Sequence, residues 1–111
     1  QRQMCIRDRD ADIVVTGEGC LDFQTAMGKV PVGVAKIAKN YNCKVIAFAG
    51  SVTEEAKKCN EKGIDAFFST LPGVCSLDEA MDTEIAQKNM RNAAEQVFRL
   101  ILALLKEKCY E

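Results

Sequence analysis

Three short apolar runs along the chain predict β-strands, because each is bounded by turn residues and is too short for a helix of ordinary length. The runs cover Ile13–Thr16, Lys44–Ala49 and Asp65–Ser69. Strands rich in β-branched and aromatic residues are usually buried in parallel sheets. The hydrophobic pattern therefore predicts a buried three-stranded sheet.

The segments between these runs carry helix start and stop signals. Pro31 suits the first turn of a helix that ends near Tyr41–Asn42. Two further helices are predicted to begin at Ser51 and at Ser76, because each serine is followed three residues later by a glutamate, the spacing of a capping box. Gly63 marks the end of the helix that begins at Ser51.

An amphipathic pattern from about Thr83 to Glu107 predicts the longest helix. Its apolar positions form one stripe: Met90, Ala93, Ala94, Val97, Phe98, Ile101, Leu104 and Leu105. We expect this stripe to be the buried face of a helix that packs on a sheet. A membrane-surface face or a coiled-coil seam is the alternative.

The order of the predicted elements is strand, helix, strand, helix, strand and then helices. Helical crossovers of this length favour parallel strand pairing and right-handed connections. The predicted fold class is therefore α/β: a three-stranded parallel, Rossmann-like β-α-β-α-β unit followed by a long C-terminal amphipathic helix.

Glycine-containing loops are predicted after all three strands, at Gly17–Gly19, Gly50–Val52 and Leu71–Gly73. The carboxyl ends of parallel strands share one edge of a sheet, where ligands commonly bind. The helix N-termini after the first two loops would favour an anion. The three loops together predict a cleft for a phosphate or carboxylate group, although a helix cap explains Ser51 equally well.

The loop after the first strand holds the densest candidate chemistry. Its acidic groups Glu18 and Asp22, together with Lys29, could bind a phosphate, a metal ion or a hydroxyl group. Simpler interpretations exist, since Asp22 could hydrogen-bond the backbone near Gln24 or Thr25 and Lys29 could be a solvated surface lysine. A loop this polar and rich in glycine beside a buried strand is more typical of a functional loop.

The composition narrows the possible chemistry. A formal net charge of −1 over 111 residues does not support nucleic-acid binding, and no apolar run approaches the roughly 18 residues needed to cross a bilayer. The six cysteines lack C-x-x-C spacing and the chain has no histidine, so we expect reduced thiols in a cytoplasmic protein rather than a zinc site. Any general base in this chain must then be a carboxylate or a lysine.

Residues 1–9 fit poorly with the rest of the chain. They begin without an initiator methionine, are densely charged, and stop where the first strand pattern begins. We expect these residues to be a non-native leader and residues 10–111 to form the folded part of the chain.

A series of motifs resembles the bacterial glycerate kinase family, of the glycerate 2-kinase type, near the C-terminal end of its members. The series begins with Thr16–Gly19, Asp22, Gln24–Thr25, Gly28–Lys29 and Pro31–Ala35. It continues with Ala47–Ser51, Gly63–Ala66, Leu71–Gly73, Ser76–Leu77 and Glu79–Ala80. The combined pattern is far more specific than any one of its pieces.

The resemblance implies transfer of a phosphoryl group from ATP, with Mg²⁺, to a hydroxyl group of D-glycerate, which gives 2-phosphoglycerate. In that interpretation Glu18 or Asp22 would orient the magnesium ion or accept the hydroxyl proton. Gln24 and Thr25 would hydrogen-bond the small polar substrate. The remaining predicted phosphate- or substrate-binding residues are Gly17, Gly19, Lys29, Gly50 and Ser51.

The chain departs from the family in two ways. Family members commonly carry a basic residue where this chain has Cys20, which would weaken anion binding if that side chain points into the cleft. Family members are also much longer, so residues 10–111 resemble the C-terminal α/β portion of a larger two-domain enzyme. The missing N-terminal part is then the expected partner, and the 111 residues alone should show little or no catalysis.

Two other interpretations are compatible with the residues. The strand-edge loops could belong to a non-catalytic module that binds a nucleotide or another anion. Alternatively, the chain could be a purely structural subdomain in which Glu18 and Asp22 only support the loop fold.

Overall fold

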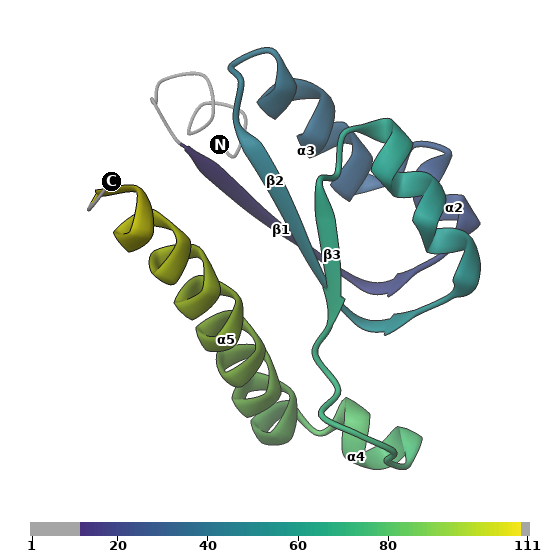
Figure 1. The fold of residues 1–111 in the computed structure, drawn as a ribbon. Helices are drawn as coiled ribbons and strands as arrows, with labels where there is room; N and C mark the ends of the chain where they lie inside the picture. Colours follow the sequence, from purple (N-terminus) through teal and green to yellow (C-terminus); the bar gives the residue numbers. More distant parts are fainter. Residues whose placement is uncertain (1–11, 110–111) are drawn as a thin grey trace. The chain divides into compact units, whose positions relative to one another are not determined.

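The computed structural model describes residues 12–109, and side chains as far as residue 106 (Figure 1). The predicted leader, residues 1–9, lies outside the described residues. The chain divides into two compact units, Gln1–Ser69 (unit 1) and Thr70–Glu111 (unit 2).

Unit 1 contains the predicted three-stranded parallel sheet. Its strands are β1 (Ile13–Leu21), β2 (Lys44–Val52) and β3 (Ala66–Ser69), in the spatial order β1-β2-β3. Both pairings are parallel. The predicted α/β class and the parallel topology are therefore confirmed.

The crossovers between the strands carry three helical segments on one face of the sheet (Figure 1). These are α2 (Phe23–Ala26), α3 (Val30–Lys39) and the 3₁₀ helix η1 (Glu54–Lys62). Pro31 lies in the first turn of α3, as predicted, where the missing N–H costs no hydrogen bond. The hydrophobic core forms where these helices meet the sheet, and it includes Leu21, Val32, Ala35, Ala38, Val45, Ala47, Ala49, Ala56, Cys59 and Ile64.

The central strand β2 is buried along five consecutive residues, 45 to 49. Side chains alternate across a sheet, so Ile46 and Phe48 face away from α3. The ring of Phe48 lies 6.0 Å from the ring of Phe68 on β3. The edge strand β1 is less buried, and Val15 is 49% exposed. The predicted burial of the strands on both faces is therefore confirmed for the central strand β2 but not for the edge strand β1.

The first two predicted loops are wrong, because Gly17–Gly19 lies inside β1 and Gly50–Val52 lies inside β2. The two strands continue to pair through these positions as far as Leu21 and Val52. The backbones come close here, since a Cβ atom on Gly50 would lie 3.1 Å from the carbonyl oxygen of Gly19. Gly50 thus permits the close approach of the two strands, and none of these glycines ends its strand.

The capping box predicted at Ser51 is also wrong. Ser51 belongs to β2, and η1 begins three residues later with Thr53 as its N-cap, which makes no side-chain cap bond. The backbone N–H of Thr53 donates to the carbonyl oxygen of Leu21 at 2.9 Å, so strand pairing extends to the helix start. The predicted end of this helix is confirmed: Gly63 has φ +104°, in the left-handed region that favours glycine.

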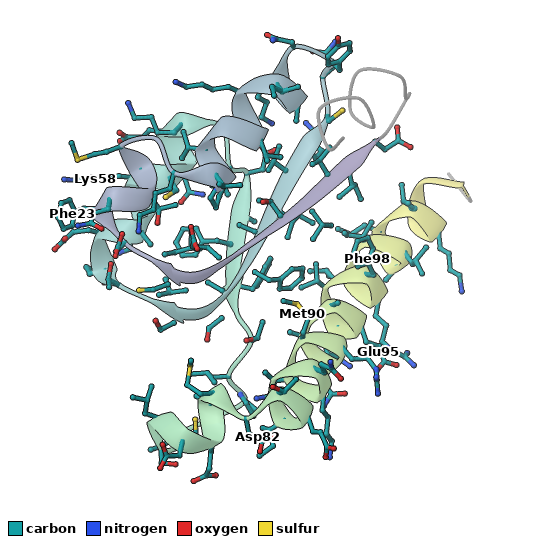
Figure 2. The ribbon with its side chains drawn as sticks, turned by 180° about the vertical axis from the view of Figure 1, so that it is seen from behind. Phe23, Lys58, Asp82, Met90, Glu95 and Phe98 are labelled. Atoms are coloured by element: carbon teal, nitrogen blue, oxygen red, sulfur yellow. The ribbon has the colours of Figure 1, made fainter. Side chains whose placement is uncertain are left out.

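Unit 2 contains the short helix α4 (Leu77–Met81) and the long helix α5 (Thr83–Cys109). The capping box at Ser76 is confirmed, since its hydroxyl oxygen accepts from the backbone N–H of Glu79 at 3.1 Å. Figure 2 shows Met90 and Phe98 on one side of α5 and Glu95 on the opposite side, as the amphipathic pattern predicts. No helix in the described residues is long and apolar enough to span a membrane.

Candidate functional site

The turn after β1 is built around Asp22. One carboxylate oxygen, Oδ1, accepts hydrogen bonds from the backbone N–H groups of Gln24 at 2.9 Å and Thr25 at 3.2 Å. In return, the backbone N–H of Asp22 donates to the hydroxyl oxygen of Thr25 at 3.2 Å. This reciprocal arrangement is a capping box at the start of α2. The predicted turn-forming role of Asp22 is confirmed.

The second oxygen of Asp22 is not used by the turn. Oδ2 makes no hydrogen bond within the part of the chain that the structure describes, and the residue is only partly buried. The backbone donors on Oδ1 hold the carboxylate in one orientation. Asp22 can therefore support the fold with one oxygen and offer the other to a ligand or a proton.

The two predicted substrate-binding residues differ in accessibility. Gln24 is exposed, whereas Thr25 is completely buried. The hydroxyl group of Thr25 lies within hydrogen-bond distance of the carbonyl oxygen of Cys20, at 3.4 Å, and also accepts from Asp22. In this conformation Thr25 supports the turn, and only Gln24 is free to reach a ligand.

Lys29 lies where the turn enters α3. Gly28 precedes it with φ +128°, a conformation that favours glycine. The exposed Lys29 is the N-cap residue of α3, and its carbonyl oxygen accepts from the N–H groups of Val32 and Gly33. The ammonium group thus stands at the positive end of the helix dipole, where an anion would be stabilised by both.

Glu18 lies four positions before Asp22 along extended backbone, which places their Cα atoms roughly 13 Å apart. The side chain of Glu18 folds back on its own strand, where Oε1 accepts from the N–H of Gly19 at 3.1 Å. The structure therefore does not bring together the two predicted magnesium ligands. Among the side chains that the structure describes, residues 12–106, no group of three or more acidic, cysteine or histidine side chains is placed to hold a metal ion.

The end of β2 offers less to an anion than the end of β1. Ser51 is exposed on the strand, and Cys20 of β1 is its partner in the register. The helix after β2 carries Glu54 and Glu55 in its first turn, where their negative charges already balance the helix dipole. These carboxylates would repel a phosphate, so the predicted anion-binding role of the loop after β2 gains no support from the geometry.

One structural link at this edge was missed by the sequence patterns. Both the N–H and the hydroxyl group of Thr53 reach the carbonyl oxygen of Leu21, at 2.9 Å and 3.3 Å, and so join the ends of β1 and β2. The thiol of Cys59, on η1, is buried in the hydrophobic core of unit 1. Burial, and to a lesser degree the charge of Asp22, raise the pKa of Cys59, which keeps the thiol neutral and unreactive.

The sequence matches the model of the Glycerate kinase family over residues 3–102, which includes the whole turn from Asp22 to Lys29. The chain belongs to the glycerate kinase family. The family resemblance expected from the motifs is thereby confirmed.

Several relatives within the glycerate kinase family carry this name. The glycerate kinase of Bacillus subtilis is 43% identical over 91 residues, which are 80% of this chain and 24% of the relative. The glycerate 2-kinase of Escherichia coli is 49% identical over 71 residues, 64% of this chain and 19% of the relative. A solved structure assigned as glycerate kinase 2 from Salmonella typhimurium LT2 matches with a TM-score of 0.63 and 43% identity, covering 92% of this chain and 24% of that structure. The chain thus spans about a quarter of the length of the relatives it matches.

Proposed function

We propose that this chain is part of a cytoplasmic enzyme that transfers the γ-phosphoryl group of ATP to D-glycerate and forms 2-phosphoglycerate. The observation that carries the proposal is the family match across residues 3–102, which contains the Asp22 turn at the carboxyl edge of a parallel sheet. The names of the relatives support the acceptor, since they are called glycerate kinase and glycerate 2-kinase.

Asp22 is the group that we assign to the acceptor hydroxyl. As the hydroxyl oxygen of glycerate attacks the γ-phosphorus, the bond from that phosphorus to the β–γ bridging oxygen breaks and ADP leaves. The hydroxyl proton moves to Oδ2 of Asp22, the oxygen that the turn leaves free. Phosphoryl transfer depends on positioning and on charge stabilisation, and the backbone donors on Oδ1 supply the positioning.

Lys29 and Gln24 are assigned to the glycerate molecule itself. The substrate carries a carboxylate, and the ammonium group of Lys29 at the N-terminus of α3 is suited to bind it. The exposed amide group of Gln24 can donate to or accept from a substrate hydroxyl group. Both residues belong to the segment that joins β1 to α3.

Magnesium enters this proposal only as part of the magnesium–ATP substrate. The described carboxylates do not converge on one point, so they do not by themselves form a resident magnesium site. The partner required for activity is the rest of the enzyme, because the chain spans about a quarter of its relatives. We therefore expect the 111 residues alone to show little or no turnover.

The test uses a chimera in which this chain replaces the matching segment of the Bacillus subtilis glycerate kinase. ADP release is followed with magnesium–ATP in the presence and absence of D-glycerate, and the product is identified by ³¹P NMR. The proposal predicts glycerate-dependent ADP release and 2-phosphoglycerate. A folded chimera that binds ATP but releases no ADP would contradict it and favour the non-catalytic binding module, with the unmodified relative as the positive control.

A further inference from the structure

The sheet of unit 1 has two edges of different length. Strand β2 lies between β1 and β3, so within the described residues each outer strand has a neighbour on one side only (Figure 1). The edge strand β3 is four residues long, whereas β1 is nine residues long. Proteins usually protect an exposed edge by keeping the strand short or by placing lysine, proline or a bulge in it. The short strand β3 follows this rule.

None of these protective features is present in β1. Its sequence, Ile13–Leu21, contains no lysine or proline, and Glu18 is its one charged residue. The pairing with β2 keeps the same offset from Ile13↔Lys44 to Glu18↔Ala49, so no extra residue forms a bulge there. The outer side of β1 therefore presents a regular row of backbone donors and acceptors, which is a template for another strand.

The first hydrogen bond of the sheet identifies the backbone groups that face outward. The carbonyl oxygen of Asp12 accepts from the N–H of Lys44 on β2 at 2.9 Å. Backbone groups of successive residues point to alternate sides of a strand, so Val14 and Thr16 face β2 as Asp12 does. The outward-facing residues are therefore Ile13, Val15 and Gly17.

One face of the sheet is also incompletely covered at this edge. Val14 packs against the hydrophobic core of unit 1, whereas Val15, whose side chain points to the opposite face, is 49% exposed. Parallel sheets normally have both faces covered. The chain spans about a quarter of the length of its relatives, so most of the enzyme lies outside it and is available to cover this edge.

We propose that the outer edge of β1 pairs in parallel with a strand from the remaining part of the enzyme, which extends the sheet beyond β1. Both described pairings are parallel, and sheets of one pairing type are favoured over mixed ones. A second copy of the chain is a poorer occupant. Two copies related by a twofold axis would pair their β1 edges antiparallel and create a mixed sheet.

The pairing gives the Asp22 turn a second wall. The strand order β1-β2-β3 runs away from β1 in one direction, so a further strand beyond β1 makes it the point where the order reverses. In doubly wound sheets, ligands bind at the carboxyl ends of the strands beside such a reversal. The turn at Asp22 directly follows β1. That the rest of the enzyme closes the glycerate site at this turn rests on the proposed function; the strand pairing itself does not.

The direct test measures residue-resolved hydrogen exchange in the chimera described above. If β1 is paired on both sides, the amide hydrogens of Val15 and Gly17 should exchange about 100-fold or more slowly than in an unstructured peptide. The amide of Thr16, which faces β2, is the internal control and should be protected in either case. A protected Thr16 together with Val15 and Gly17 that exchange at the unstructured rate would overturn the proposal.

A second test distinguishes a paired strand from a loop that only covers the edge. Val15→Pro removes an outward N–H and leaves the bonds to β2 in place, so it should lower the Tm of the chimera by about 4 °C or more. Ala66→Pro is the matched control at the other edge. The N–H of Asp65 donates to the carbonyl oxygen of Val45 on β2, so the N–H of Ala66 faces outward. Its Tm shift should stay below about 2 °C, and equal shifts in the two variants would overturn the proposal.

These measurements are independent of turnover, which separates the inference from the proposed function. Protected Val15 and Gly17 in a chimera without turnover would support the pairing and refute the kinase. Turnover in a chimera whose β1 edge exchanges freely would refute the pairing and retain the kinase. Protection that disappears on dilution, with a sedimentation mass of two copies, would assign the edge to a second copy and overturn the proposal.

Discussion

The ends of β1 and β2 lie side by side at one edge of the sheet, yet they carry opposite chemistry. The β1 end continues into a capped turn with an oriented carboxylate at Asp22 and a free cation at Lys29. The β2 end continues into η1 without a side-chain cap and with two glutamates in its first turn. Glycine residues are present at both ends, so glycine content does not decide where an anion binds; the charges in the first helical turn do.

The two strand ends also use a short polar side chain in different ways. Asp22 binds two backbone N–H groups and keeps one oxygen free. Ser51 remains within the strand and forms no cap. Variants that change the charge, the glycine or the cap at one strand end, each compared with a change at the other strand, test whether these differences determine substrate binding and stability.

The largest of these effects is expected from Lys29→Glu, which gives the β1 end the charge of the β2 end. Loss of the cation and addition of a carboxylate should raise KM for D-glycerate in the chimera by about tenfold or more. Lys44→Glu, the same change at the amino end of β2, should leave KM within about twofold. Equal effects from the two variants would show that Lys29 acts only through net charge.

The second effect concerns the close approach of the two strands. A Cβ atom at Gly50 would lie 3.1 Å from a backbone oxygen of Gly19, whereas a Cβ atom at Gly19 would meet no atom within 4 Å. Gly50→Ala should therefore lower the free energy of unfolding by about 1–2 kcal/mol. Gly19→Ala should change it by less than about 0.5 kcal/mol, measured by urea unfolding. A larger loss at Gly19 would contradict the observed strand pairing.

The third effect tests the cap at the β1 end. Asp22→Ala removes the acceptor for two N–H groups and should cost about 1 kcal/mol of stability. Ser51→Ala removes no cap bond and should cost less than about 0.5 kcal/mol. Thermal unfolding of the two variants and of the unmodified chain measures both costs. If Ser51→Ala is clearly destabilised, then Ser51 has the capping role that was predicted from the sequence and that the structure does not show.

The smallest effect is a pH dependence at the opposite edge of the sheet. Burial raises the pKa of Asp65, but hydrogen bonds from Lys39 and from the N–H of Val45, at 2.7 Å, outweigh it and lower the pKa overall. Its stabilising contribution is then present above the unfolded pKa of about 4 and is lost as the pH falls through the folded pKa.

Because the ion pair is partly exposed and screened, Asp65→Asn should cost at most about 1 kcal/mol at about pH 7 and nearly nothing at about pH 2. Urea unfolding at the two pH values measures the difference. Asp12→Asn, an exposed aspartate without a described side-chain hydrogen bond or ion pair, is the control. A cost that grows as the pH falls would contradict the assigned direction.

The strands were predictable because each is a short apolar run in the local sequence. Their parallel pairing was predictable because the helical crossovers between them are long enough to bring the chain back to the same end of the sheet. The cap at Asp22 and the end of η1 at Gly63 were predictable from the local sequence as well. The extension of β1 and β2 through their glycines was not, since pairing with a neighbouring strand outweighed local loop preferences. The grouping of Lys36, Lys58 and Lys62 around one pocket was also missed, because these lysines come together only when α3 and η1 pack.

The decisive experiment measures the turnover number and the thermal stability of the chimera carrying Asp22→Asn. Asparagine caps a helix as well as aspartate does, so stability should change by less than about 0.5 kcal/mol. Without the free carboxylate oxygen, kcat should fall by about 100- to 10,000-fold. If the Asp22→Asn chimera is stable and keeps its kcat, then the proposed division of labour, in which one oxygen of Asp22 holds the turn and the other serves the reaction, is wrong.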